Sequence, residues 1–161
     1  EGAHGAARGA PAVADGEEEG AEGPALAAAI TVMRTYRQEP VVETLWRQGQ
    51  RLADGIRHTT GTLGLDKFFE VVGRPCNLIY IARDAEGRPS QAFRTLFLRE
   101  TIMRGLIMPS MVVSIAHTDE VIDATIERIG EALTVYKRAL DEGIAKYLPV
   151  PSVKPVLRKY N

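Results

Sequence analysis

Residues 110 to 123 read Ser-Met-Val-Val-Ser-Ile-Ala-His-Thr-Asp-Glu-Val-Ile-Asp, and this stretch decides the fold. Its first half, Met111 to Ala116, is rich in β-branched side chains and has the length of a buried strand. Thr118 followed by two carboxylates is a strong helix start, because its hydroxyl accepts backbone N–H bonds and acids favour the positive end of the helix dipole. The stretch therefore predicts a core strand that ends at His117 and leads directly into a helix.

The residues after this junction predict a long amphipathic helix from about Asp119 to Glu142. Gly143 ends the pattern, and a proline-containing tail, Tyr147 to Asn161, follows. The apolar face recurs at helical spacing, at Ile122, Ile126, Ile129, Leu133, Tyr136 and Leu140.

The segment before the junction predicts two strands and a helix. Phe68 to Val72 and Asn77 to Ala82 are β-branched and aromatic runs separated by Gly-Arg-Pro, so we expect them to pair in one sheet. Ser90 is a good N-cap for a helix from Gln91 to Arg104, and Gly105 is well placed to end it.

Two further helices are expected in the N-terminal half, one from about Ala25 to Arg37 and one that begins directly after Pro40 and ends in a loop at residues 58–62. Gly49 falls on the apolar face of the second helix. A glycine there costs about 1 kcal/mol against alanine, so it either weakens the helix prediction or marks a close backbone approach. That face consists of Val42, Leu45, Leu52 and Ile56.

Residues 1–23 are almost entirely Gly, Ala, Glu, Pro, Arg, His and Asp. Such a segment buries too little apolar surface to offset its ordering entropy, so we expect a disordered arm. Residues 24–161 then form one domain with a leading helix. Strands mixed with helices at these lengths predict an α+β fold, with a sheet of about three strands covered by helices on one face.

Composition narrows the classes of partner. The chain of 161 residues carries 20 basic and 21 acidic side chains, a balance that predicts no nucleic-acid partner and no attraction to anionic membranes. No apolar run approaches the roughly 20 residues of a membrane span, so we expect no membrane association and a cytoplasmic location. The single cysteine, Cys76, is expected to be an inert core thiol rather than a reactive one.

Few residues suggest chemistry. The histidines are scattered and the cysteine is alone, which predicts no metal site. Ser110, Ser114 and His117 are the candidates on the substrate side, although no acid or oxyanion loop accompanies them and polar groups at a strand end explain them as well. The lysines lie in charged or tail contexts without the apolar surroundings that lower an amine pKa. The residues themselves predict no catalytic and no cofactor-binding group in this chain.

Several segments resemble the C-terminal part of class III pyridoxal-phosphate (PLP) aminotransferases, and most of all the glutamate-1-semialdehyde aminotransferase (2,1-aminomutase) branch. The resemblance covers about Gly20 to Asn161. It implies the small C-terminal domain of a fold-type-I PLP enzyme, whose Schiff-base lysine and ring contacts lie in a large domain outside this chain. The segments that carry it are Ala25–Met33, Arg104–Ile107 and Ser114–Asp119 with Ile122-Asp123.

Two departures from that family qualify the resemblance. Glu17-Glu18-Glu19 stands where the family has a threonine-containing loop that reaches the cofactor phosphate, and carboxylates repel a phosphate. Pro109-Ser110 leads almost directly into the following strand, without the glutamate-bearing segment of the aminomutases. The change of composition near Gly20 also suggests that residues 1–19 arise from a truncation or a reading-frame artefact.

Two classes of function remain open. In the first, the chain is the substrate-closing part of a PLP-dependent aminotransferase or aminomutase that acts on an amino acid or amino-aldehyde, with PLP held by a large domain in a homodimer. The chain is then inactive alone. In the second, the 161 residues are the whole product and form a non-catalytic binding or assembly module.

Overall fold

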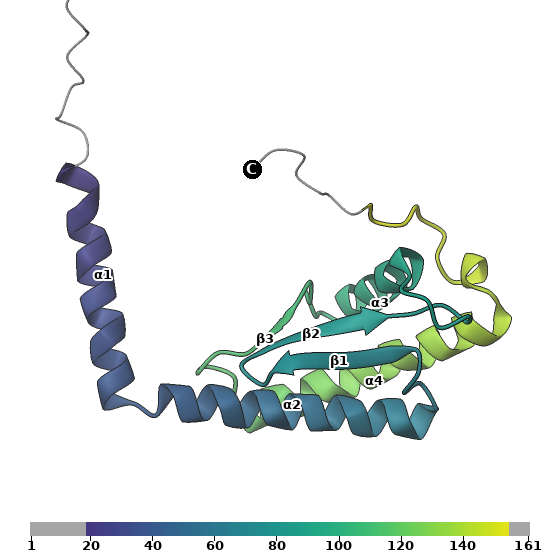
Figure 1. Cartoon of the computed structure of the whole chain (residues 1–161), viewed down its shortest axis with the longest axis horizontal. Helices are drawn as coiled ribbons and strands as arrows, with labels where there is room; N and C mark the ends of the chain where they lie inside the picture. The colour runs from purple at the N-terminus through teal and green to yellow at the C-terminus, as the bar shows by residue number, and fades with distance from the viewer. Residues whose placement is uncertain (1–18, 155–161) are drawn as a thin grey trace, which may run out of the picture. The chain divides into compact units, whose positions relative to one another are not determined.

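The computed structural model describes residues 19–154, and most of the expected arm, residues 1–18, lies outside the described residues, as do residues 155–161 (Figure 1). The chain divides into two compact units, Glu1–Pro40 and Val41–Asn161. Each is described by itself below.

The first unit contains α1, Glu19–Gln38, which begins six residues before the expected start at Ala25. Residues 19–23, expected to belong to the arm, are therefore helical, and Pro24 lies inside the helix. Proline lacks the N–H that would bond the carbonyl of Gly20, so the helix continues through it with one hydrogen bond fewer. The alanine-rich stretch lies after Pro24, whereas the extension itself contains two glycines, so helix propensity does not explain the earlier start.

The second unit begins with α2, Val41–Leu63, which runs through the loop expected at residues 58–62. Threonine hydroxyls bond the helix's own carbonyls there: Thr59 donates to Gly55 and Thr62 to His58. The helix ends only where Gly64 takes a φ of 69°. The buried face includes Val41, whereas Val42 was wrongly expected there and is 49% exposed.

The sheet has three antiparallel strands in the order β1 (Phe69–Arg74), β2 (Asn77–Ala82) and β3 (Met111–Val112). The predicted pairing of the first two strands is confirmed. The prediction of a strand over Met111 to Ala116 is wrong, because the ladder stops at Val112. Ser114 donates its N–H to His117 Nδ1 at 3.2 Å and accepts the N–H of His117 at 3.1 Å, and this turn takes the chain out of the sheet.

The last two long helices match their predicted starts. In α3, Gln91–Met103, the Ser90 hydroxyl accepts the N–H of Phe93, and Gly105 beyond the helix has a φ of 79°. In α4, Asp119–Glu142, the Thr118 hydroxyl accepts the N–H of Val121. A short 3-10 helix, η1 (Ile144–Lys146), follows Gly143.

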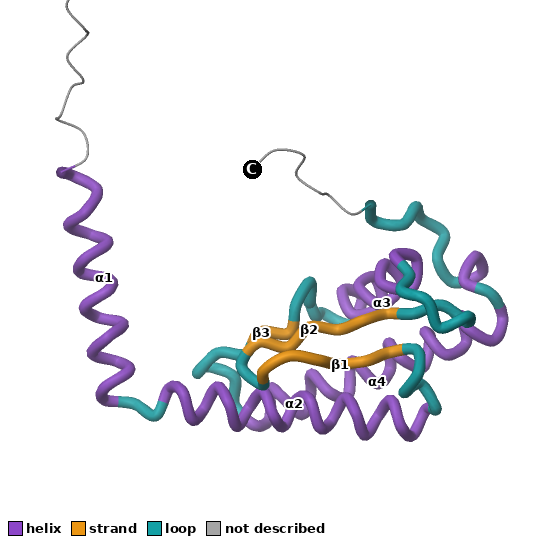
Figure 2. Tube along the Cα trace, in the orientation of Figure 1, coloured by secondary structure: helices purple, strands orange, loops and turns teal. Residues whose placement is uncertain are grey.

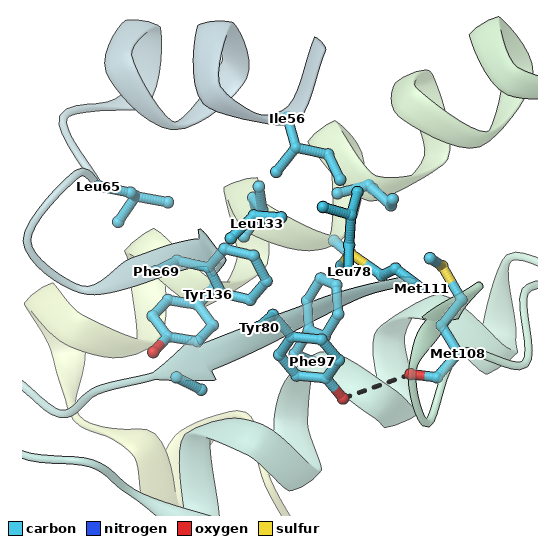
Figure 3. Close-up of a cluster of buried hydrophobic side chains, with 14 of the residues drawn as sticks. Ile56, Leu65, Phe69, Leu78, Tyr80, Phe97, Met108, Met111, Leu133 and Tyr136 are labelled. Atoms are coloured by element: carbon cyan, nitrogen blue, oxygen red, sulfur yellow. Dashed lines mark hydrogen bonds between the residues drawn. The ribbon is translucent and has the colours of Figure 1, made fainter. Parts of the chain in front are cut away.

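The helices of this unit cover one face of the sheet, which confirms the predicted α+β architecture (Figure 2). Alternate residues of β1 and β2 point into the core, where the rings of Phe69, Tyr80, Phe97 and Tyr136 contact one another (Figure 3). The Tyr136 hydroxyl accepts the N–H of Arg83 at 2.9 Å and lies 3.1 Å from the Phe68 carbonyl. It therefore ties the start of β1 to the end of β2. Among the helices of residues 19–154, none combines the length and apolar composition that a membrane span requires.

Candidate functional site

A cavity of about 240 Å³ opens beside β3 and the start of α4. The cavity is lined by the loop from Gly105 to Met108, both residues of β3, the first turns of α4 and Leu52 of α2. Most of the lining is aliphatic. The polar lining residues are Ser110, His117 and Thr125.

The structure brings together two of the three residues predicted for the substrate side. Ser110 and His117 both line the cavity, whereas Ser114 is exposed and does not. Because His117 Nδ1 accepts the N–H of Ser114, the neutral ring carries its proton on Nε2 and presents a donor. Within residues 19–154, His117 forms no ion pair with a carboxylate, so the group does not form a nucleophile–base–acid relay.

A cluster of charged residues lies where α2 meets the start of α4. Arg51 donates to both carboxyl oxygens of Asp123 at 2.7 Å, and Arg47 donates to Asp119 at 2.9 Å. Hydrogen bonds from Gln48 and Arg47 lower the pKa of Asp119, and the bond from Arg51 lowers that of Asp123. The cluster thus holds both carboxylates ionised and fixes the end of α4 that borders the cavity.

Gln48 is the buried member of this cluster, with 1% of its surface exposed. Its Nε2 donates to Asp119 at 2.7 Å, while its Oε1 has no hydrogen-bond partner. The sequence does carry a signal for this cluster: polar residues recur at helical spacing in α2, and two acids stand four positions apart in α4.

A second basic group contacts the loop that precedes β3. Arg94 of α3 lies over the ring of Tyr80, with its guanidinium carbon 5.8 Å from the ring centroid. It also donates to the carbonyl of Pro109 at 3.4 Å, and the Tyr80 hydroxyl donates to the carbonyl of Met108 at 3.3 Å (Figure 3). Both bonds hold the Met108–Ser110 loop, two residues of which line the cavity.

The residues of the described chain do not fit a PLP site. The cavity lining contains no lysine or arginine for a Schiff base or a phosphate. Lys67, Lys137, Lys146 and Lys154 are exposed on the surface, and Lys159 lies outside the described residues. The ion pair with Glu142 raises the pKa of Lys146, which is the opposite of what a Schiff-base amine requires.

The described residues contain neither a metal-binding cluster nor a core thiol. Residues 19–154 contain no group of three histidine, cysteine or acidic side chains that could hold a metal ion. Cys76 is a free thiol in the turn between β1 and β2, and it is half-buried there rather than in the core where we expected it.

No protein-family model and no curated protein matches the chain. Among solved structures, it is similar to the PLP internal aldimine form of the FumI protein of Sphingopyxis sp. MTA144, with a TM-score of 0.61 and 24% identity over 72% of this chain. The match spans 28% of the FumI chain. The likeness shows the fold: an α+β domain of a kind that also occurs within a larger, PLP-bearing protein.

Proposed function

We propose that this chain is the small domain of a PLP-dependent aminotransferase or aminomutase of class III, and that it helps to close and shape the substrate site. The observation that carries the proposal is the similarity of its fold to part of the FumI structure, which bears PLP. The family resemblance of Ser114–Asp119 adds support, because this segment lies beside the cavity and contains Thr118, the residue that caps α4. The substrate in this proposal is an amino acid or amino-aldehyde, as in the glutamate-1-semialdehyde branch.

The cofactor in this proposal is held outside the described residues. PLP supplies an electron sink for the amino-group chemistry when it is bound. This chain contributes the cavity wall, the Nε2 donor of His117 and the hydroxyl of Ser110. Its apolar lining excludes water and its polar groups orient the substrate.

The partner in this proposal is a large PLP-binding domain, and the complete enzyme is a homodimer. The face of the sheet that α2, α3 and α4 leave open supports such a partner. Ile79 of β2 is 53% exposed there and Val112 of β3 is 57% exposed. Neighbouring apolar side chains on an open sheet face favour association with another surface.

PLP labelling followed by borohydride reduction tests this proposal. The 161-residue chain is incubated with PLP, reduced and mapped by mass spectrometry. A longer product, which includes the coding sequence that precedes the chain in its genome, is treated in parallel. We expect a stoichiometric pyridoxyl-lysine in the longer product only, at a lysine outside the chain.

The control in this experiment is the pattern of slow, nonspecific labelling that exposed lysines give. Replacing Lys146 by glutamine removes one such site and leaves the rest of the pattern unchanged. A stoichiometric adduct at one lysine of the 161-residue chain alone contradicts the proposal. So does an upstream sequence that encodes no lysine-bearing domain in any reading frame.

A non-catalytic assembly module is the second candidate function, and the open sheet face is the observation that favours it. It predicts a stable complex between copies of the 161-residue chain without PLP. The first proposal instead predicts a complex with a PLP-bearing domain. Sedimentation with and without the longer product separates the two.

A further inference from the structure

Four arginines in residues 19–154 are half-buried, and they differ in how their charge is balanced. Three of them pair with carboxylates: Arg83 with Glu70 at 3.0 Å, and both Arg99 and Arg104 with Glu100 at 2.5 and 2.8 Å. The fourth, Arg94, forms no ion pair with a carboxylate among the described residues. A half-buried cation loses part of its hydration, so an unpaired one is unusual and calls for an explanation.

Neutral groups hold Arg94 in place. The Tyr80 ring lies 5.8 Å from the guanidinium carbon, and the Pro109 carbonyl accepts one N–H at 3.4 Å. A guanidinium has five N–H donors in a rigid fork, so most of its donors remain free. Its position is therefore fixed while its capacity to bind an anion is largely unused.

Tyr80 does not supply the missing negative charge. Burial raises the pKa of its phenol, against a smaller opposite effect of Arg94, so the hydroxyl stays neutral near pH 7. The hydroxyl donates to the Met108 carbonyl at 3.3 Å. Arg94 therefore places one unbalanced positive charge beside the loop that ends in Ser110.

We propose that Arg94 binds the carboxylate of a small molecule at the edge of the Met108–Ser110 loop. The planar fork of a guanidinium matches a carboxylate with two parallel hydrogen bonds. Ser110 adjoins Pro109, to which Arg94 is bonded, and its hydroxyl is exposed for a further contact.

A single carboxylate group suits this site better than a phosphate dianion does. Among the described residues, Arg94 is the cation that bonds this loop, through the Pro109 carbonyl. One guanidinium balances one carboxylate group, whereas a phosphate dianion places two negative charges at the same point and would leave one of them unbalanced. In the complete enzyme the ligand is the carboxylate of the amino-acid substrate. That last step rests on the proposed function, but carboxylate binding by Arg94 does not.

Nuclear magnetic resonance of the arginine Nε–H groups tests the proposal on the full 161-residue chain. The probe is glutarate, added at constant ionic strength with sodium chloride, and its diamide serves as the uncharged analogue. The Nε–H signal that is absent from the spectrum of Arg94→Gln is assigned to Arg94. We expect glutarate, and not the diamide, to shift that signal with a saturable, millimolar midpoint.

Variants separate binding from a purely structural role. Arg94→Gln should weaken glutarate binding about tenfold or more, read from the backbone N–H signals of Met108 and Ser110. Arg94→Lys keeps the charge but loses the fork, and should bind with intermediate affinity. Arg74→Gln, an exposed arginine without an ion pair in the described chain, is the matched control and should bind as the wild type does.

The outcomes decide the proposal without reference to PLP. If glutarate leaves the Arg94 signal unmoved, or moves it no more than the diamide does, Arg94 only tethers the loop and the proposal is overturned. If Arg74→Gln weakens binding as much as Arg94→Gln does, the effect is general electrostatics and the proposal is likewise overturned. If glutarate binds but the PLP-labelling experiment fails, Arg94 is still a carboxylate site, and the protein has a function other than the one proposed above.

Discussion

Gly49 shows at the scale of one residue how closely α2 approaches the turn between β1 and β2. A Cβ at this position would lie 1.8 Å from the Pro75 carbonyl oxygen, so any side chain must push the helix and the turn apart. We expect Gly49→Ala to lower the free energy of unfolding by about 2–3 kcal/mol, measured by urea denaturation. Of the two explanations that the sequence left open for this glycine, the close approach is confirmed.

Gly61 in the same helix is the matched control. The nearest atom to a Cβ there is a carboxyl oxygen of Asp66 at 3.6 Å, an ordinary contact. Gly61→Ala should therefore raise stability by about 0.5–1 kcal/mol through helix propensity and a less flexible unfolded chain. Equal effects of the two substitutions would show that packing against Pro75 does not matter.

Tyr136 makes a second prediction at this scale. Its buried hydroxyl bonds the N–H and carbonyl of Arg83, at 2.9 and 2.6 Å, beside the Phe68 carbonyl. We expect Tyr136→Phe to cost about 1–3 kcal/mol in thermal or urea unfolding, because buried backbone groups lose a partner. Tyr80→Phe removes one longer bond and should cost less. The reverse order would contradict the role given to Tyr136.

At the scale of elements, capping signals predicted the starts of α3 and α4 and the bounds of β2 were also predicted correctly, whereas the start of α1 and the length of β3 were not. Ser90 and Thr118 cap their helices as expected, since capping depends on side chains within three residues. Residues 113–116 were predicted as strand from composition, yet a strand also requires a neighbour. Because of the Ser114–His117 turn, only Met111 and Val112 pair with β2. Pairing between strands that are far apart in the sequence cannot be read from local composition.

The candidate site was predictable in part for the same reason. Ser110 and His117 were identified because they flank an abrupt change of polarity, and both line the cavity. Arg94 was not identified. Its role depends on contacts with Tyr80 and Pro109, which are 14 and 15 residues away in the sequence and come close to Arg94 only when the chain is folded.

The cap of α4 gives a prediction for that element. The Thr118 hydroxyl accepts the N–H of Val121 at 3.4 Å, and Thr118→Ala should cost about 1 kcal/mol of stability. Thr125→Ala is the control within the same helix, because that hydroxyl bonds the helix's own Val121 carbonyl and caps nothing. Unchanged thermal stability of Thr118→Ala would remove the argument for the helix start.

The contact between α2 and α4 predicts a dependence on pH. The folded pKa of Asp123 lies below its ordinary value of 3.8 because Arg51 binds its charged form. The pair therefore adds stability above about pH 4, and this contribution is lost as the pH falls through the folded pKa. We expect Asp123→Asn to be less stable than the wild type near pH 6, and we expect this difference to shrink as the pH falls below 4 and the Asp123 carboxylate takes up its proton. Urea midpoints measured from pH 6 down into the acid range test this, and a difference that stays the same in acid would contradict the ion pair.

At the scale of the whole second unit, the two faces of the sheet differ: one packs against the helices and stabilises the domain, and the other is open. Leu78 points into the core at 1% exposure, and its neighbour Ile79 points out at 53%. We expect Leu78→Ala to cost about 2–5 kcal/mol of stability. Ile79→Lys should change stability by no more than about 0.5 kcal/mol, because it removes few contacts within the domain.

The same pair of variants tests whether the open face is an interface. Ile79→Lys places a charge in the middle of that face, so it should weaken association with a PLP-binding domain, or between copies of the isolated chain, without unfolding the protein. Sedimentation velocity over a range of concentrations measures the association, and urea unfolding confirms that the variant is folded. If Ile79→Lys associates as strongly as the wild type, the open face is not the surface that joins this domain to the rest of an enzyme.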